Sequence, residues 1–246
     1  MADCVSAKIQ HTPSRTVVLR VGSAYRSDLA ILFLHGFPGK IGNRNLDLAE
    51  AVFAATGANV FLPHYRGLGF SDGLFSFTQS VTDTLNIAED LLIGKKFKKI
   101  FLVGHSWGGF VALNLLAKQP LLFSHTVLLS PLFAIPERSR LEKLAPTLLN
   151  DHREILSSKS DAALVAEFEE VRAKFKPLDN LSGKTRETCT ILQALHDLEI
   201  PASINQKLAH ENFPAQNYTE VDQDHRFQKD RPGITKQLIE VILSHL

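Results

Sequence analysis

Short apolar segments alternate with helical patterns along the chain, and this alternation predicts the fold. Each segment is a continuous apolar run, which is typical of strands buried on both faces of a sheet. The segments are Thr16–Val21, Leu29–Leu34, Ala58–Leu62, Lys99–Val103, Thr126–Leu129, Thr188–Leu195 and Asn217–Val221. Such strands separated by helices predict an α/β fold, a mostly parallel, doubly wound sheet with helices on both faces.

Helical patterns fill most of the intervals between these strands. The predicted helices are Leu46–Ala55, Gln79–Ile93, Trp107–Lys118, Ser203–Glu211 and Gly233–Leu246. In the last of them, Ile234, Leu238, Val241 and Ile242 recur at helical spacing and form a stripe that faces the core. The N-terminal part is short, so seven strands are expected.

One region, residues 132–184, has helical patterns but no convincing strand. Leu141, Leu144 and Leu148 fall on one helical face. Leu164, Phe168, Val171 and Phe175 fall on another, with Glu167, Glu170 and Lys174 opposite. We expect a small helical cap, inserted into a single core domain made of residues 1–131 and 185–246. Such a cap would lie over the strand ends, where open α/β sheets bind ligands; alternatively, its helices simply cover a face of the sheet.

The segment "VGHSWGG" places a serine between a predicted strand and a predicted helix. Gly104-His105-Ser106-Trp107-Gly108 has the Gly-x-Ser-x-Gly pattern in the strand–turn–helix context of a nucleophile elbow. The sharp turn strains the serine backbone, and the two glycines leave it room. We therefore predict that Ser106 is a nucleophile, with the positive end of the helix dipole behind it.

A serine hydroxyl needs a base and a group that orients the base. His225 follows the last predicted strand, and Asp197 follows the strand before it. The order Ser106, Asp197, His225 matches the order expected for this sheet. Glu199, Asp222 and Asp224 lie nearby and remain alternatives for the acid. The preceding loop, Ser130-Pro131-Leu132-Phe133, has no carboxylate before Glu137, which favours Asp197. We expect His196 and His245 to be surface residues.

Two backbone N–H groups are candidates for an oxyanion hole. One belongs to Trp107, directly after the nucleophile, and the other to Phe37, in the loop after an early strand. Gly36 allows the loop a conformation in which the Phe37 N–H points into the site. An ordinary turn rich in glycine and proline is the alternative for this loop.

Composition and charge limit the kinds of molecule that the chain is expected to bind. The chain has 246 residues, 44% of them hydrophobic and 22% charged, with a net charge of +1. This balance gives no electrostatic case for nucleic acid. No apolar run approaches the ~20 residues of a membrane span, so we expect no membrane insertion. We expect a monomer or a homodimer. Lys95, Lys96, Lys98 and Lys99 form the most basic patch, which we interpret as a solvated helix end.

The N-terminal residues and the cysteines indicate the cellular compartment. The N-terminal residues lack the apolar core of a secretory signal. Cys4 and Cys189 are far apart in the sequence and form neither a metal-binding motif nor a disulfide framework. We expect a cytoplasmic protein.

The motifs in their order resemble those of the α/β-hydrolase superfamily. They are "FLHGFPG", "PHYRGLGFSDG", "LVGHSWGG", Asp197 before "EIP", and "DHRF". The resemblance runs from about residue 29 to 246 and leaves out the predicted cap. It implies Ser106 as nucleophile, His225 as general base, Asp197 as orienting acid and an oxyanion hole from the Phe37 and Trp107 backbones. It also implies no metal and no organic cofactor.

The resemblance leaves several reactions open. Ser106 excludes the subgroups with an aspartate or cysteine nucleophile. We expect a serine hydrolase that cleaves a carboxylic ester with a small or medium apolar acyl group, bound by Phe37, Trp107, Phe110, Phe133 and also Phe168. Thioesterase, amidase and carbon–carbon bond hydrolase activities use the same residues. An aminopeptidase would need acidic cap residues, for which Glu137, Glu142, Glu167, Glu169 and Glu170 are candidates. A ligand-binding protein with little or no turnover is the alternative of another class.

Overall fold

In the computed structural model of the chain, the described residues are 6–11, 16–22, 28–38, 45–69, 71–93, 97–156 and 159–246. Several residues of the sequence predictions lie outside these ranges. They are Cys4, Gly39 of the motif "FLHGFPG", Lys95 and Lys96 of the basic patch, and Phe70 of the loop after the third predicted strand.

The described strands form one sheet of eight, in the order β1-β2-β4-β3-β5-β6-β7-β8. Their bounds are β1 Ser6–His11, β2 Val17–Gly22, β3 Leu29–Leu34, β4 Asn59–His64, β5 Lys99–His105, β6 His125–Leu129, β7 Cys189–His196 and β8 Tyr218–Asp224. The pairs from β4 and β3 through to β8 are parallel. β2 pairs antiparallel with both β1 and β4. The fold is therefore the mostly parallel α/β sheet that the apolar runs predict.

All seven predicted strands are present, and β1 precedes them as an eighth. Its sequence, SAKIQH, contains no apolar run. β1 lies at the edge of the sheet and pairs only with β2, from Ser6 opposite Gly22 to His11 opposite Val17. An edge strand of this kind has little hydrophobic pattern by which it can be recognised.

The described helices connect these strands. They are α1 Asn45–Thr56, α2 Phe77–Ala88, α3 Trp107–Lys118, α4 Arg138–Asp151, α5 Arg153–Leu156, α6 Asp161–Lys174, α7 Pro177–Asn180, α8 Gly183–Glu187, α9 Ala202–Asn212 and α10 Arg231–Ser244, with a π-helical turn η1 Glu89–Ile93 and a 3₁₀ turn η2 Ala215–Asn217. α3 has the predicted bounds, and its start at Trp107 directly after β5 makes the turn that carries Ser106.

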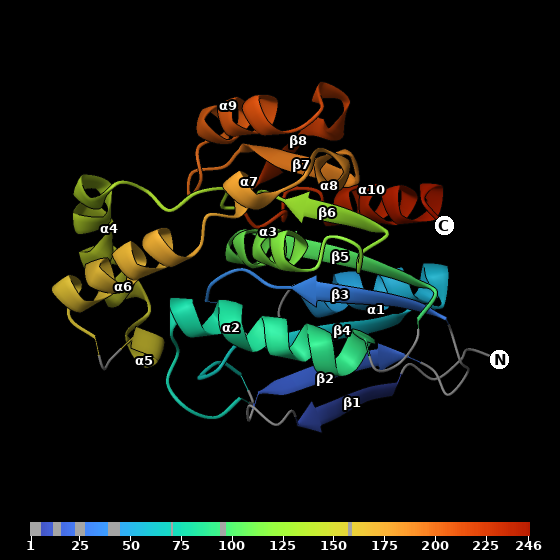
Figure 1. Cartoon of the computed structure of the whole chain (residues 1–246), viewed down its shortest axis with the longest axis horizontal. Helices are drawn as coiled ribbons and strands as arrows, with labels where there is room; N and C mark the ends of the chain where they lie inside the picture. The colour runs from blue at the N-terminus through green and yellow to red at the C-terminus, as the bar shows by residue number, and fades with distance from the viewer. Residues whose placement is uncertain are drawn as a thin grey trace.

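The helices cover the two faces of the sheet, and each face has its own apolar core (Figure 1). α2 and α3 lie on one face with Trp107, Phe110 and Leu113 in the core beneath them. α1 and α10 lie on the other, where Val52 packs in the same cluster as Leu238. β3, β4 and β6 are buried at every position, as expected for strands covered on both sides.

Helices α4 to α8 lie between β6 and β7 in the sequence. In Figure 1, α4, α5 and α6 lie to the left, beside the carboxyl ends of the parallel strands. Leu164, Phe168 and Val171 of α6 are buried, as their spacing predicts. Leu144 of α4, predicted on one helical face with Leu141 and Leu148, is exposed, and Leu141 and Ala145 are the buried residues of this helix.

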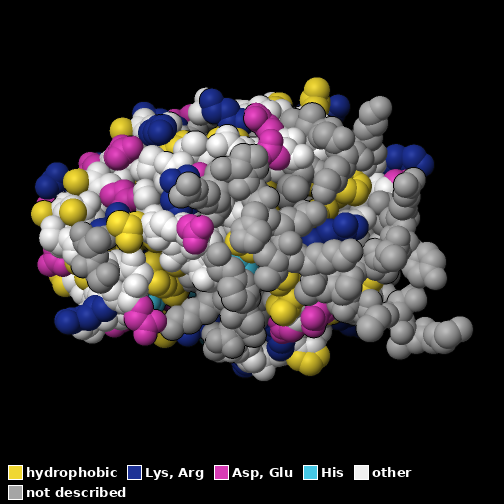
Figure 2. All heavy atoms as spheres, turned by 90° about the horizontal axis from the view of Figure 1, so that it is seen from below, with side chains coloured by type: hydrophobic (Ala, Val, Ile, Leu, Met, Phe, Trp, Pro, Cys, Tyr) yellow, Lys and Arg dark blue, Asp and Glu magenta, His cyan; other side chains and the backbone are white. Residues whose placement is uncertain are grey.

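The described surface mixes charges of both signs. In the view of Figure 2, dark-blue and magenta side chains are interspersed over the part of this face that is described. Opposite charges meet in surface pairs such as Arg138 with Glu142 and Lys236 with Glu240. Among the described residues, no helix combines the length and the apolar character that crossing a membrane requires.

Candidate active site

Ser106 lies in a strained turn between β5 and α3. Its φ is 54° and its ψ is −119°, a conformation that residues with a side chain rarely adopt. The Ser106 N–H donates to the Leu129 carbonyl at 3.0 Å, and the Ser106 carbonyl accepts from Gly109 at 2.9 Å and from Leu132 at 3.0 Å. These three bonds hold the serine backbone in the strained conformation.

Gly104, Gly108 and Gly109 allow close contact around the turn. A Cβ at Gly108 would lie 2.3 Å from the Leu34 carbonyl oxygen, and one at Gly104 would lie 2.6 Å from the Gly108 carbonyl oxygen. A Cβ at Gly109 would lie 2.5 Å from Pro131 Cβ. These distances are too short for any side chain, so the start of α3 packs directly against the ends of the neighbouring segments.

The structure brings Ser106, His225 and Asp197 together. His225 Nε2 lies 2.9 Å from Ser106 Oγ, and His225 Nδ1 lies 2.7 Å from Asp197 Oδ2. With Nδ1 donating to the carboxylate, Nε2 is left to accept the serine proton. His225 follows β8 and Asp197 follows β7, so both side chains come from the carboxyl edge of the sheet.

Asp197 is buried and is held by its own loop. Its Oδ1 accepts from the Glu199 N–H at 3.0 Å and from the Ile200 N–H at 2.6 Å, while Oδ2 faces His225. Gln193 Nε2 also approaches Oδ2, at 3.4 Å. The carboxylate is therefore fully hydrogen-bonded with one oxygen directed at the imidazole.

The other candidate acids have different positions. Asp222 pairs at the surface with His196 and Lys229, and Asp224 accepts from the Gln228 N–H. Glu199 Oε2 lies 3.5 Å from His225 Nε2, on the side of the ring away from Asp197. Of these carboxylates, only Asp197 contacts Nδ1. His196 and His245 are exposed, as predicted.

The two predicted oxyanion donors belong to segments that approach Ser106. Gly36 is so close that a Cβ there would lie 3.0 Å from Ser106 Cβ, and Phe37 is the next residue. The Phe37–Pro38 peptide bond is cis. Trp107 is the first residue of α3, where backbone N–H groups have no partner within the helix.

His105, for which the sequence predicts no role, contacts the backbone of His225. Its Nε2 donates to the His225 carbonyl oxygen at 2.8 Å, and the two imidazole rings lie 5.2 Å apart between centroids. Burial and the nearby His225 ring lower the pKa of His105 to about 3. His105 is therefore a neutral ring that ties the segment before Ser106 to the segment that carries His225.

His35 holds the backbone of the loop that contains Gly36. Its Nδ1 donates to the Gly36 carbonyl oxygen at 2.7 Å, and its own carbonyl accepts from the Tyr65 hydroxyl at 2.9 Å. Burial lowers the pKa of His35 to about 4, so this ring is neutral in the folded protein at neutral pH.

Aromatic rings form a continuous cluster beside the serine. Phe77 is central to it, with its ring centroid 4.8 Å from Trp107, 5.0 Å from Phe37 and 4.4 Å from Phe168. Phe75 contacts both Phe37 and Phe77. Phe37, Trp107 and Phe168 were predicted near the site from the sequence. Phe75 and Phe77, which lie where a loop leads into α2, were not predicted there.

The two remaining predicted pocket residues differ in their surroundings. Phe110 stacks on Trp107 at 5.0 Å between ring centroids and so extends the cluster. Phe133 is buried against Phe213, at 5.6 Å. Its position therefore fits core packing.

Four of the five acidic residues that were candidates for an amine site make ion pairs or hydrogen bonds, and the fifth, Glu170, is exposed. Glu167 was predicted on the outward face of its helix, but its side chain is only 9% exposed. It accepts from Ser76 Oγ at 2.5 Å, from the Phe77 N–H at 2.6 Å and from Lys159 Nζ at 2.5 Å. Glu137 and Glu169 pair with Arg172, and Glu142 pairs with Arg138.

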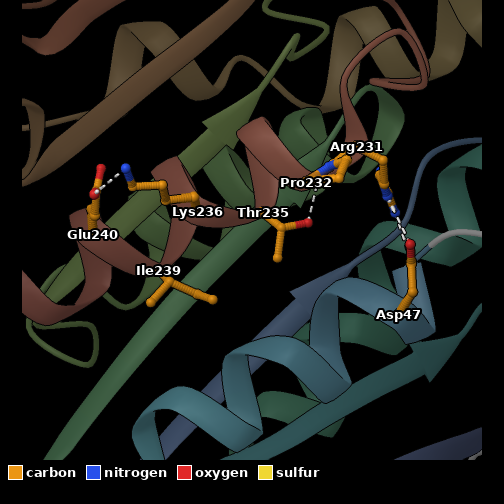
Figure 3. Close-up of a pocket in the computed structure, with 7 residues that line it drawn as sticks. All are labelled: Asp47, Arg231, Pro232, Thr235, Lys236, Ile239 and Glu240. Carbon is orange, nitrogen blue, oxygen red and sulfur yellow. Dashed lines mark hydrogen bonds and ion pairs between the residues drawn. The ribbon is translucent and has the colours of Figure 1, made fainter.

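A shallow hollow of about 660 Å³ lies elsewhere, between α1 and α10 (Figure 3). It is lined by Asp47, Arg231, Pro232, Thr235, Lys236, Ile239 and Glu240. Arg231 makes two hydrogen bonds to Asp47, at 2.7 and 2.8 Å, across it. The described residues that line it include no serine, cysteine or histidine, so the candidate active site is the one around Ser106.

Known proteins are similar to this chain in sequence. Residues 26–207 match the family model described as "Serine aminopeptidase, S33". A stretch of 97 residues is 38% identical to the monoglyceride lipase of Mus musculus and covers 37% of this chain and 32% of the lipase. Another, of 92 residues, is 37% identical to protein bem46 of Schizosaccharomyces pombe and covers 36% of this chain and 30% of that protein. The matches thus span about a third of the length of these curated relatives.

Solved structures share the fold over almost the whole chain. The mouse alpha/beta hydrolase domain-containing protein 10 has a TM-score of 0.67 and 13% identity, with 97% of this chain and 99% of that chain covered. Est1E from Butyrivibrio proteoclasticus with bound ferulic acid has a TM-score of 0.66 and 15% identity, with 94% and 96% covered. The chain therefore has the α/β-hydrolase fold.

Proposed function

The chain belongs to the serine aminopeptidase S33 family of α/β-hydrolase-fold serine hydrolases, and from this premise we propose that it hydrolyses carboxylic esters. Ser106 is the nucleophile, His225 the general base and Asp197 the residue that orients it. The observation that carries the proposal is the continuous set of short contacts, 2.9 Å from Ser106 Oγ to His225 Nε2 and 2.7 Å from His225 Nδ1 to Asp197 Oδ2.

The reaction proceeds in two steps. His225 Nε2 takes the proton of Ser106 as its Oγ bonds to the ester carbonyl carbon, and the Phe37 and Trp107 N–H groups hold the oxyanion. The carbon–oxygen bond to the alcohol then breaks, the alcohol oxygen takes the proton from His225, and an acyl-enzyme remains. In the second step His225 takes a proton from water, whose oxygen bonds to the acyl carbon. The bond from that carbon to Ser106 Oγ then breaks, Oγ takes the proton back from His225, and the acid is released.

Two features favour an ester with an apolar acyl group. The aromatic cluster of Phe37, Phe75, Phe77, Trp107 and Phe168 offers apolar surface beside the serine. The mouse relative is named as a monoglyceride lipase, and the Est1E structure holds ferulic acid, a carboxylic acid. We propose that residues 132–184 form a cap that closes the acyl side of this site.

The surroundings of the cap residues argue against recognition of a free amine. Glu167 already accepts three hydrogen bonds, one of them from Lys159. Glu137, Glu142 and Glu169 each pair with an arginine. These four carboxylates are paired within the protein, and Glu170, the remaining candidate, is exposed on α6. The pairing of the four supports an ester substrate over an aminoacyl one.

The test is covalent labelling combined with turnover. The wild-type protein and Ser106→Ala are incubated with a fluorophosphonate probe and with p-nitrophenyl acetate. We expect labelling and hydrolysis by the wild type only, and no labelling of His225→Ala. A panel of short esters, thioesters and aminoacyl amides then tests the bond class. A wild-type protein that shows no labelling and no hydrolysis above the level of Ser106→Ala would contradict the proposal and would favour ligand binding without turnover.

A further inference from the structure

Glu199 and Arg226 form an ion pair beside the imidazole of His225. Glu199 Oε2 lies 3.5 Å from His225 Nε2, and Arg226 Nε donates to Glu199 Oε1 at 3.2 Å. The Glu199 side chain is 49% exposed and the Arg226 side chain 56%. The pair thus combines contact with a buried ring and access from solvent.

The backbone of both residues is fixed to the candidate catalytic residues. The Glu199 N–H donates to Asp197 Oδ1 at 3.0 Å, and Arg226 directly follows His225. Their Cα positions therefore depend on the same loops that hold the acid and the base. This gives the pair a defined place relative to Ser106, which an ordinary surface ion pair lacks.

The proposed ester hydrolysis determines which part of the substrate lies next to Glu199 and Arg226. His225 Nε2–H gives its proton to the leaving oxygen of the ester, so that oxygen must come within hydrogen-bond distance of Nε2, roughly 2.6–3.2 Å. A carboxylate oxygen 3.5 Å from the same nitrogen is then a neighbour of the alcohol portion of the substrate. The aromatic cluster, by contrast, is available to the acyl portion.

The chemistry of the pair selects among alcohols. Glu199 accepts hydrogen bonds and Arg226 donates them, while their formal charges cancel. A hydroxyl group both donates and accepts, so a neutral alcohol with additional hydroxyls can bond to both partners. A simple alkyl alcohol has no additional hydroxyl to bond to either group, and an anionic alcohol is repelled by the Glu199 carboxylate.

We propose that Glu199 and Arg226 bind the leaving alcohol and determine specificity for esters of a polyhydroxylated alcohol such as glycerol. This inference rests on the proposed ester hydrolysis. The bonds made and broken are those of the acyl transfer itself: the carbon–oxygen bond to the polyol breaks, and its oxygen takes the proton from His225 Nε2. The two residues hold the remaining hydroxyls and do not change covalently.

The test compares two esters of one acid, 1-monohexanoylglycerol and methyl hexanoate. The measured quantity is the ratio of kcat/KM for the glycerol ester to kcat/KM for the methyl ester. We expect Glu199→Gln and Arg226→Gln each to lower this ratio about tenfold, as for loss of one hydrogen bond to a charged group. Glu211→Gln, on exposed α9, is the matched control and should leave both kcat/KM values unchanged.

Other outcomes separate this inference from the proposed function. A ratio unchanged within about twofold in both variants would overturn the inference, even if hydrolysis of both esters requires Ser106. A preference for choline hexanoate that Glu199→Gln abolishes would also overturn it, in favour of a cation site. If Ser106→Ala and the wild type hydrolyse neither ester, the proposed function itself fails. Circular dichroism of each variant confirms that it is folded.

Discussion

At the scale of single residues, the candidate site depends on which carboxylate faces His225 Nδ1. Asp197 Oδ2 lies 2.7 Å from Nδ1, and its other oxygen accepts two backbone N–H groups. The carboxylate can therefore hold the imidazole in the tautomer whose Nε2 accepts the serine proton. Replacing it with an amide removes that control while conserving the shape of the side chain.

We predict that Asp197→Asn lowers kcat by about 10³- to 10⁴-fold, the loss expected when the base is held in the wrong tautomer. Steady-state hydrolysis of p-nitrophenyl acetate by wild type and variant measures the two kcat values. Asp222→Asn, which changes a surface carboxylate paired with Lys229, is the control and should keep wild-type kcat. Full activity of Asp197→Asn would assign the orienting role to another carboxylate of the region.

Gly108 provides a prediction about stability. A Cβ there would lie 2.3 Å from the Leu34 carbonyl oxygen, which belongs to the backbone of a central strand. Because a backbone atom cannot move aside as a side chain can, we expect Gly108→Ala to lower the free energy of unfolding by about 2–4 kcal/mol. Urea denaturation measures this loss. Gly183→Ala is the control, since a Cβ at Gly183 would meet nothing within 4 Å.

At the scale of elements, Glu167 links α6 to the start of α2. It accepts from the Phe77 N–H, in the first turn of α2, where N–H groups lack partners within the helix. It also accepts from Ser76 Oγ and Lys159 Nζ. One carboxylate of the region between β6 and β7 thus stabilises a helix that covers the sheet.

We predict that Glu167→Ala lowers the free energy of unfolding by about 3 kcal/mol, because Lys159 is then left largely buried without its partner. Hydrogen exchange should also rise in the first turn of α2, which loses the acceptor for the Phe77 N–H. Glu142→Ala, which breaks an exposed pair within α4, should change neither quantity measurably. Unchanged exchange at Phe77 in Glu167→Ala would contradict the link.

Sequence patterns predicted the central elements because periodicity reports burial. The strands that lead to Ser106 and Asp197 contain apolar runs, and the glycines around Ser106 mark a tight turn. β8, which leads to His225, is mostly polar, and its prediction depended on its place between two helical patterns. Glu167, in contrast, sits one position from the buried Phe168, and its partner Ser76 is 91 residues away. Phe75 and Phe77 lie where a loop leads into α2, and periodicity says nothing about burial in a loop. Such contacts depend on tertiary packing and leave no local signal.

At the scale of the whole molecule, buried neutral histidines make stability depend on pH. Burial lowers the pKa of His35 and of His125 to about 4 each. In the unfolded chain these rings take up protons below about pH 6.5, whereas in the folded protein they remain neutral until about pH 4. The stability they contribute is therefore complete above pH 6.5 and is lost as the pH falls toward 4.

We predict that the free energy of unfolding decreases by about 1 kcal/mol for His35 alone between pH 6.5 and pH 5.5. Urea denaturation over this range measures the slope. His35→Gln, which carries no titrating ring, should show a shallower slope than the wild type. Identical slopes in the two proteins would contradict the neutral, buried state of His35.

The site is assembled from distant parts of the chain. Ser106 and His225 are 119 residues apart in sequence, and His225 occupies its place only after β8 has paired with β7 at the end of the sheet. Contacts between such distant segments form late and slowly during folding. The rate at which Ser106 regains reactivity toward a fluorophosphonate therefore reports the pairing of β8 with β7 during refolding. We expect this reactivity to appear after the circular dichroism signal of the helices has recovered.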